Sequence, residues 1–184
     1  MRIISHVSHF ARILALGAWI GAIIYFAAVV TQGAFSVLPS QDEAGLLVGF
    51  TLGGLHLMGL IAAAIFIIAS VAMMRSLKAF VEPAVIGVIL MAVATIASQD
   101  YVIPRMNVLR TQMVSIQATP GNDPRRVEFD RLHRISVDLE GAVLLIGLAS
   151  LFLATRKAGI HRTLRPTAGS RQGEAENAGN GQRF

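Results

Sequence analysis

Residues 44–74 read AGLLVGFTLGGLHLMGLIAAAIFIIASVAMM, a run of 31 residues between Glu43 and Arg75 with no charged side chain. An α-helix rises 1.5 Å per residue, so about 20 residues cross the hydrocarbon core of a bilayer. This run is long enough to cross it with residues to spare. It predicts a membrane-spanning helix over residues 48–74.

Three further charge-free runs lie on either side of this stretch. There are 29 residues between Arg12 and Asp42, 17 between Glu82 and Asp100, and 15 between Glu140 and Arg156. They predict spanning helices over about residues 10–33, 81–101 and 132–155. The apolar part of the first run is longer than the core of a secretory signal peptide, so we expect this helix to be retained. The predicted fold is all-α, an integral membrane four-helix bundle.

The composition agrees with a membrane protein. Of 184 residues, 54% are apolar and 15% are charged, with a mean hydropathy of +0.61. Soluble domains are about a quarter charged. The absence of cysteine excludes thiol nucleophiles and Cys-ligated zinc or iron–sulfur centres. The net charge of +5 comes from arginines near the ends of apolar runs and in the C-terminal region, which indicates membrane topology. We therefore expect the lipid bilayer, and no nucleic acid, as a partner.

The distribution of Lys and Arg predicts the orientation. The first connection carries Asp42 and Glu43 but no basic residue, whereas the second carries Arg75 and Lys78 and the segment after the last run is basic. Because cytoplasmic loops are rich in Lys and Arg, we expect both termini in the cytoplasm, in a bacterial inner membrane. Six arginines between the third and fourth runs argue the other way.

The segment between the third and fourth runs is expected to form an extramembrane helical excursion. Residues 101–116 have helical apolar spacing, with Pro104 positioned to kink or restart the helix. A turn cluster follows at residues 119–124, and Asp123 before Pro124 is a candidate N-cap for the next helix. We predict a membrane domain over residues 1–158 and a disordered basic tail over residues 159–184.

Small residues recur in the first two predicted helices. Gly17 and Gly21 are four residues apart in the first, and Gly49, Gly53 and Gly59 lie in the second. Such spacing lets helix backbones approach closely. It predicts tight packing within the bundle, and it is also the basis for expecting a homo-oligomer.

The fourth run suggests a polar cluster at one membrane boundary. Fifteen residues span only about 22 Å, so the helix must include residues before Gly141. His133, Ser136 and Glu140 then share one stripe, whereas Asp138 points elsewhere. Asp100 and Arg105 end the third helix on the same side of the membrane. We predict that Arg105 pairs with Glu140 or Asp138; the alternative is that these groups extend to the lipid headgroups.

Histidines provide a second candidate site. His56 lies inside the 31-residue apolar run, and His133 falls on the same predicted side of the membrane. A haem or metal ion held between helices requires such inward-facing imidazoles. The candidate ligands are therefore His56 paired with His133 or with His9. The alternative is that each histidine bonds to a neighbouring helix.

The chain resembles the transmembrane protein 205-like family in several short motifs. The similarity covers about residues 6–155. The chain departs from the family at one position: the family tends to have Asn seven residues after the histidine of the fourth helix, and this chain has Glu140 there. The residues that carry it are His9, Trp19, Gly21, Phe26, Leu38, Pro39, Ala44, Gly45, Pro104, Arg105, Phe129, His133 and Ser136. The resemblance implies four membrane helices. Animal relatives are linked to resistance to platinum drugs, and no enzyme activity is implied.

Two functions are consistent with these residues. The first is a non-enzymatic membrane protein that uses His133, Glu140 and Arg105 in the transport, export or scaffolding of a small solute or metal, with no cofactor. The second is a membrane oxidoreductase with haem or a metal ion on His56 and His133 or His9. Hydrolysis is disfavoured because no nucleophile–base spacing is present.

Overall fold

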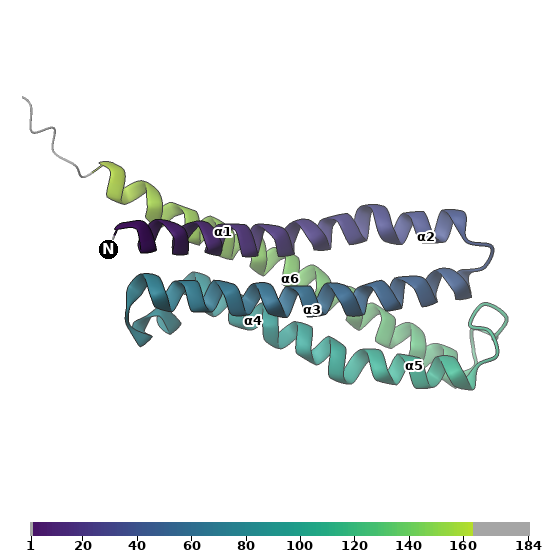
Figure 1. Cartoon of the computed structure of the whole chain (residues 1–184). Helices are drawn as coiled ribbons and strands as arrows, with labels where there is room; N and C mark the ends of the chain where they lie inside the picture. The colour runs from purple at the N-terminus through teal and green to yellow at the C-terminus, as the bar shows by residue number, and fades with distance from the viewer. Residues whose placement is uncertain (1, 164–184) are drawn as a thin grey trace, which may run out of the picture. The chain divides into compact units, whose positions relative to one another are not determined.

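The computed structural model describes the backbone of residues 2–163 and the side chains of residues 5–156. Among these, residues 2–154 form one compact unit, and the part of the last helix from Thr155 onward is assigned to a second. Four long helical segments make up the described chain (Figure 1). Their parts are α1 (Arg2–Tyr25), η1 (Phe26–Thr31) and α2 (Gln32–Val37), then α3 (Gln41–Met74), then α4 (Pro83–Ala97), η3 (Ser98–Val102) and α5 (Ile103–Gln112), and finally α6 (Pro124–Thr163), with a short 3₁₀ helix η2 (Leu77–Val81) before α4.

The all-α fold with four potential membrane spans is confirmed. The helices long and apolar enough to cross a membrane are Ser5–Val37, Gln41–Met74, Pro83–Gln112 and Pro124–Arg156. Each helix is longer than its predicted span, and the third begins at Pro83, two residues later than predicted. Charge-free runs mark only the part that suits hydrocarbon, whereas helical hydrogen bonding continues through the polar residues at each end.

The helix boundaries follow from specific capping residues. The Ser40 side chain accepts a hydrogen bond from the Glu43 N–H at 3.2 Å and begins α3. Arg75 ends α3 in the left-handed region, with φ of 48°. Pro83 begins α4, where its missing N–H costs nothing. The predicted N-cap at Asp123 is confirmed, because its Oδ1 accepts from the Arg125 N–H at 2.9 Å at the start of α6.

Two π-helical turns interrupt the long segments without breaking them. One is η1, between α1 and α2, and the other is η3, between α4 and α5. Pro104, at the start of α5, was expected to kink or restart the helix. A proline ring collides with the carbonyl four residues earlier, and the wider turn over Ser98–Val102 lies at that point. The segment therefore stays helical to Gln112, four residues short of the predicted end.

The core of the residue 2–154 unit runs along α1, α3, α4 and α6. Its most buried members include Leu16, Phe66, Val85, Met91 and Val143. Glycines set the closest approaches between these helices. A Cβ at Gly147 of α6 would lie 3.0 Å from Met91 Cε and 3.1 Å from Ile20 Cγ1, so a side chain there would push α6 away from α4 and α1.

Gly59 of α3 packs closely against Trp19 of α1. A Cβ at this position would lie 2.8 Å from Trp19 Cζ2, within the indole ring. By contrast, a Cβ at Gly17, Gly21, Gly49 or Gly53 would meet nothing within 4 Å. The predicted packing role of the small residues is therefore filled by Gly59 and not by the other four.

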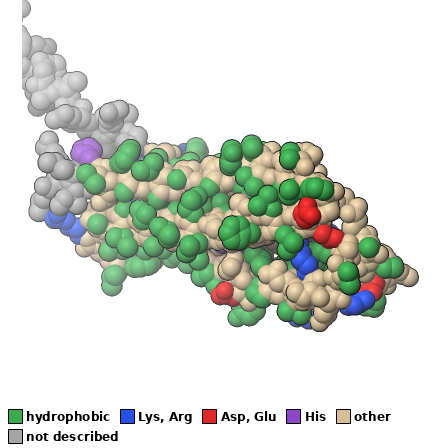
Figure 2. All heavy atoms as spheres, turned by 45° about the vertical axis from the view of Figure 1, so that its right-hand side comes forward, with side chains coloured by type: hydrophobic (Ala, Val, Ile, Leu, Met, Phe, Trp, Pro, Cys, Tyr) green, Lys and Arg blue, Asp and Glu red, His purple; other side chains and the backbone are tan. Residues whose placement is uncertain are grey.

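The outer surface of the helices is apolar. Figure 2 shows hydrophobic side chains spread along them, with acidic side chains toward the end that carries the α5–α6 loop and basic side chains at both ends. Phe50, Ile68, Leu145 and Phe152 are among the large apolar residues that are more than half exposed. This is the surface expected of a protein surrounded by lipid.

The predicted tail begins at residue 159. In the structure α6 continues to Thr163, and residues 164–184 lie outside the described chain.

Candidate functional site

A cavity of about 540 Å³ opens between the helices at the end of the bundle that carries the α2–α3 and α5–α6 connections. Its wall along α6 extends from Arg126 to Leu144, about 27 Å of helix axis. Most of the lining is apolar, and charged groups lie at both ends. The lining includes Ile23, Phe26, Thr31, Phe35, Asp42, Gly45, Leu52, Ile103, Arg110, Gln117, Arg126, Phe129, Asp130, His133, Ser136, Glu140 and Leu144.

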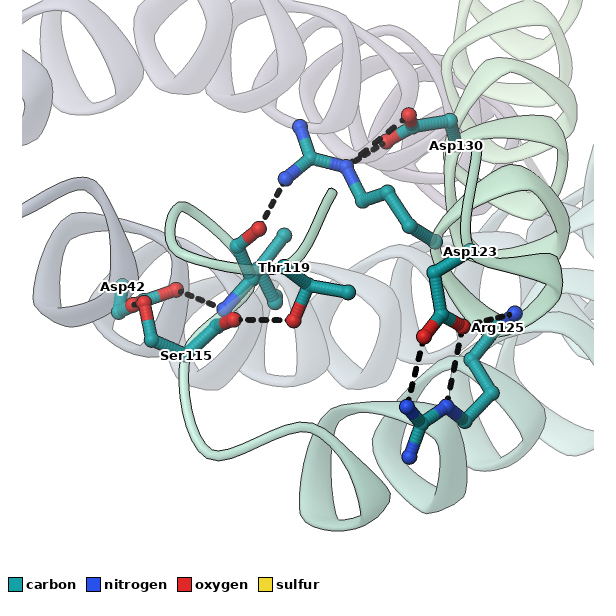
Figure 3. A network of polar contacts seen from close by, with 8 residues as sticks. Asp42, Ser115, Thr119, Asp123, Arg125 and Asp130 are labelled. Atoms are coloured by element: carbon teal, nitrogen blue, oxygen red, sulfur yellow. Dashed lines mark hydrogen bonds and ion pairs between the residues drawn. The ribbon is translucent and has the colours of Figure 1, made fainter. Parts of the chain in front are cut away.

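Hydrogen bonds from Asp42 fasten the α5–α6 loop to the start of α3 at the rim (Figure 3). The Asp42 carboxylate accepts from Ser115 Oγ at 2.5 Å and from the Ile116 N–H at 3.0 Å. Thr119 Oγ1 donates to the Ser115 carbonyl at 2.6 Å. Arg126 donates to Asp130 at 3.0 Å and also to the Ile116 carbonyl. These contacts hold the loop at the cavity mouth.

A second contact joins the end of α5 to the beginning of α6. Arg125 donates to Asp123 through Nε at 3.0 Å and Nη2 at 2.7 Å (Figure 3). Its Nη1 donates to the Gln112 carbonyl at 3.0 Å. Hydrogen bonds from the Arg125 side chain and backbone lower the pKa of Asp123 from 3.8 to about 2. Asp123 is therefore an ionised cap at any physiological pH.

The inner end of the cavity is a polar triad contributed by three segments. His56 of α3 is 2% exposed. Its Nδ1 lies 2.9 Å from Gln99 Oε1 in η3, and its Nε2 lies 2.5 Å from Glu140 Oε1 in α6. Glu140 lines the cavity, whereas His56 and Gln99 are behind it. The cavity thus reaches a carboxylate that is hydrogen-bonded to a buried imidazole.

This geometry lets His56 and Glu140 share one proton. As the amide is oriented, Gln99 Oε1 accepts, so His56 Nδ1 donates to it. Nε2 then either donates to the Glu140 carboxylate or accepts from the neutral acid. Moving one proton across 2.5 Å converts an ion pair into a neutral pair without moving a heavy atom. A polar pair of this kind within a membrane span is a strong candidate for function.

Three residues of the predicted cluster line the cavity together. They are His133, Ser136 and Glu140, which the helical period placed on one stripe of α6. Ser136 is buried, and His133 is exposed to the cavity mouth. Asp138 is exposed and does not line the cavity, in keeping with its different direction on the helix.

The expected partner of Arg105 is corrected by the structure. The Arg105 side chain is 71% exposed, and its Nε lies 3.9 Å from Glu128 Oε1. Glu140 pairs with His56 instead, and Asp100 is exposed outside the cavity. The sequence placed these groups at the correct end of the bundle, but η3 and α5 direct Asp100 and Arg105 away from Glu140.

The three candidate cofactor ligands do not converge in this arrangement. Both ring nitrogens of His56 are already hydrogen-bonded. His133 lies seven residues before Glu140, about 10 Å along α6, and His9 lies near the start of α1. Among the described residues, no group of three or more His, Asp or Glu side chains could hold a metal ion.

An ion pair at the opposite end of the bundle was missed by the sequence analysis. Arg12 Nη2 lies 2.9 Å from Glu82 Oε1, and both side chains are 2% exposed. The guanidinium also stacks over the Phe66 ring at 4.7 Å. Arg12 had been considered only as a charge before the first span. Its position four residues before Leu16, on the face that continues to Trp19 and Ile23, was the available signal.

The fold and the cavity together define a class: a four-helix integral membrane protein with a mostly apolar cavity open at one end. A family model described as Domain of unknown function (DUF4149) matches residues 14–115. This is more than half of the chain, so the chain belongs to that family. The match includes His56, Gln99 and Arg110 but stops before Glu140. No curated protein and no solved structure matches the chain.

Proposed function

We propose that this protein binds a small solute in the cavity and carries it across the membrane, with the His56–Glu140 pair exchanging a proton as the solute moves. The single observation that carries the proposal is that the cavity ends on Glu140, whose carboxylate lies 2.5 Å from a buried imidazole. The apolar walls suit an apolar solute body, and pockets of about 300–1,000 Å³ are typical of small-molecule sites.

We place the protein in a bacterial inner membrane with both termini in the cytoplasm, so that the cavity opens to the outside. A second copy associates through the surface at Gly17 and Gly21, where added Cβ atoms would meet nothing within the chain. The resemblance to the transmembrane protein 205-like family, whose animal relatives are linked to drug resistance, favours export of the solute.

Cysteine labelling tests the cavity directly, because the natural chain has no cysteine. Ser136→Cys should react with a membrane-impermeant thiosulfonate added to intact cells, since Ser136 lines the cavity. Gln117→Cys at the rim is the positive control, and Leu145→Cys, which is 69% exposed on the apolar surface, should not react. Labelling at Gln117 without labelling at Ser136 would contradict an open cavity. Labelling of both only in inverted vesicles would reverse the orientation.

The proton-exchange step has its own test. Solutes that protect Ser136→Cys from labelling would be loaded into proteoliposomes and their flux measured across a pH gradient. Glu140→Gln should still bind these solutes but lose pH-driven flux, because the amide cannot share the proton of His56. Asp138→Asn is the matched control, since Asp138 is an exposed acid on the same helix outside the cavity. Equal flux in the two variants would refute the coupling role.

A further inference from the structure

Arg110 stands out among the charged residues around the cavity. Its guanidinium lies over the Phe129 ring at 5.6 Å, and its Nε is buried with no hydrogen-bond partner. On the other side it faces the backbone of Gly45, where an added Cβ would lie 3.0 Å from Nη2. The absence of a side chain at Gly45 leaves room for the guanidinium. Arg110 is therefore held between an aromatic ring and a glycine, with at least one donor left over.

The other charged groups at the rim are already engaged within the protein. Arg126 is bonded to Asp130 and to a backbone carbonyl. Asp42 is close enough to interact electrostatically with Arg110, but its two oxygens accept from the α5–α6 loop. The acidic side chains at the rim already accept hydrogen bonds within the protein, which disfavours a cationic ligand. Arg110 keeps an unused donor, which favours an anionic ligand.

The cavity also provides an apolar surface next to Arg110 for the rest of the ligand. From Arg110 and Phe129 at the rim, the walls continue past Phe26 and Leu52 to Leu144. A ligand with its charge at Arg110 would extend an apolar body along this wall. A planar guanidinium suits carboxylate, sulfonate or phosphate oxygens, which accept two parallel hydrogen bonds.

We infer that the cavity selects an amphipathic organic anion, with its acidic group bound by Arg110 and its apolar body directed toward Glu140. This rests on the proposed function and names its substrate class. The anion is either a free organic acid or the phosphate of a membrane lipid, and the two share the same chemistry at Arg110.

The probe is 2-naphthoate, with neutral 2-naphthamide for comparison. Binding would be measured by titration calorimetry to the full chain in nanodiscs of phosphatidylcholine alone, with empty nanodiscs as the blank. We expect 2-naphthoate to bind at least about tenfold more tightly than 2-naphthamide, because a charge-assisted bond to a guanidinium contributes about that much. Arg110→Gln should remove this preference. Arg105→Gln, a change of the same charge on the same helix at a 71% exposed site, should keep it.

The outcomes separate the inference from the proposed function. Equal binding of the two probes to the natural chain, or an equal effect of the two glutamine variants, would overturn the role of Arg110 while leaving a cavity that Ser136→Cys labelling can still support. Arg110→Lys guards against a folding defect: it keeps the charge without the planar fork, and the preference for the anion should persist at reduced strength. A loss of 2-naphthoate binding in nanodiscs that contain phosphatidylglycerol, larger for the natural chain than for Arg110→Gln, would support the same site and identify an anionic lipid headgroup as its occupant.

Discussion

Removal of Arg12 should destabilise the protein more than removal of any exposed arginine. Its guanidinium and the Glu82 carboxylate are 2.9 Å apart and both are 2% exposed. At an effective dielectric constant of 20, their attraction is about 6 kcal/mol, and desolvation of the two charges offsets most of it. Arg12→Met leaves Glu82 buried without this cation, so we expect a loss of about 3–5 kcal/mol in the free energy of unfolding.

A double-mutant cycle isolates the pair. Arg12→Met with Glu82→Gln removes both charges together, and we expect it to cost at least about 2 kcal/mol less than the sum of the two single variants. Unfolding would be followed in dodecyl sulfate titrations by helical circular dichroism and by the fluorescence of Trp19, the single tryptophan of the chain. The matched control is Arg131→Met, because Arg131 is 68% exposed and lies 3.6 Å from Glu128. That variant should change stability by less than about 0.5 kcal/mol.

Two results would refute this reasoning. If Arg12→Met costs no more than Arg131→Met, the buried charge of Glu82 is satisfied without Arg12. If the double variant costs the sum of the single variants, the two side chains do not interact energetically despite their 2.9 Å separation.

Two further predictions concern packing and capping. Gly59→Ala should destabilise the protein by about 1–3 kcal/mol and alter Trp19 emission, because the new Cβ would overlap a buried indole; Gly53→Ala, which enters open space, should show no such loss in the same titration. Asp123→Ala should speed amide hydrogen exchange in the first turn of α6, where the Asp123 carboxylate accepts from the Arg125 N–H. Because the pKa of folded Asp123 is lowered to about 2, the ionised cap stabilises the helix start fully above pH 3.8, and this stabilisation is lost as the pH falls through about 2. Amide exchange in the natural chain and in the variant should therefore differ at pH 5 and be the same at the acid end. A difference that persists below pH 2 would contradict the ionised cap.

The helices could be predicted from the sequence because each carries a long charge-free run. The start of α6 could be predicted because Asp123 followed by Pro124 is a typical helix N-terminus. The π turns at Phe26–Thr31 and Ser98–Val102 could not be predicted. A π turn has no residue type of its own, and Pro104 pointed only to a disturbance of the helix nearby.

The candidate site could be predicted only within single helices. The stripe of His133, Ser136 and Glu140 follows from the helical period of α6. The contact of His56 with Glu140 depends on how α3 and α6 rotate against each other. The rotation of α6 follows from contacts with other helices, such as Ser150 against Gly87 of α4, and the periodicity of one helix does not contain them.

The two π turns make the cavity sensitive to residue number as well as residue type. Phe26 and Thr31 of the first turn line the cavity, and Ile103 lines it immediately after the second. Each extra residue within a helix rotates everything beyond it by about 100°. Deletion of one residue from η1 would keep the hydropathy of the span but swing Phe35 off the cavity wall. Over evolutionary time, a one-residue insertion or deletion in these turns would therefore reshape the cavity while the four spans themselves are kept.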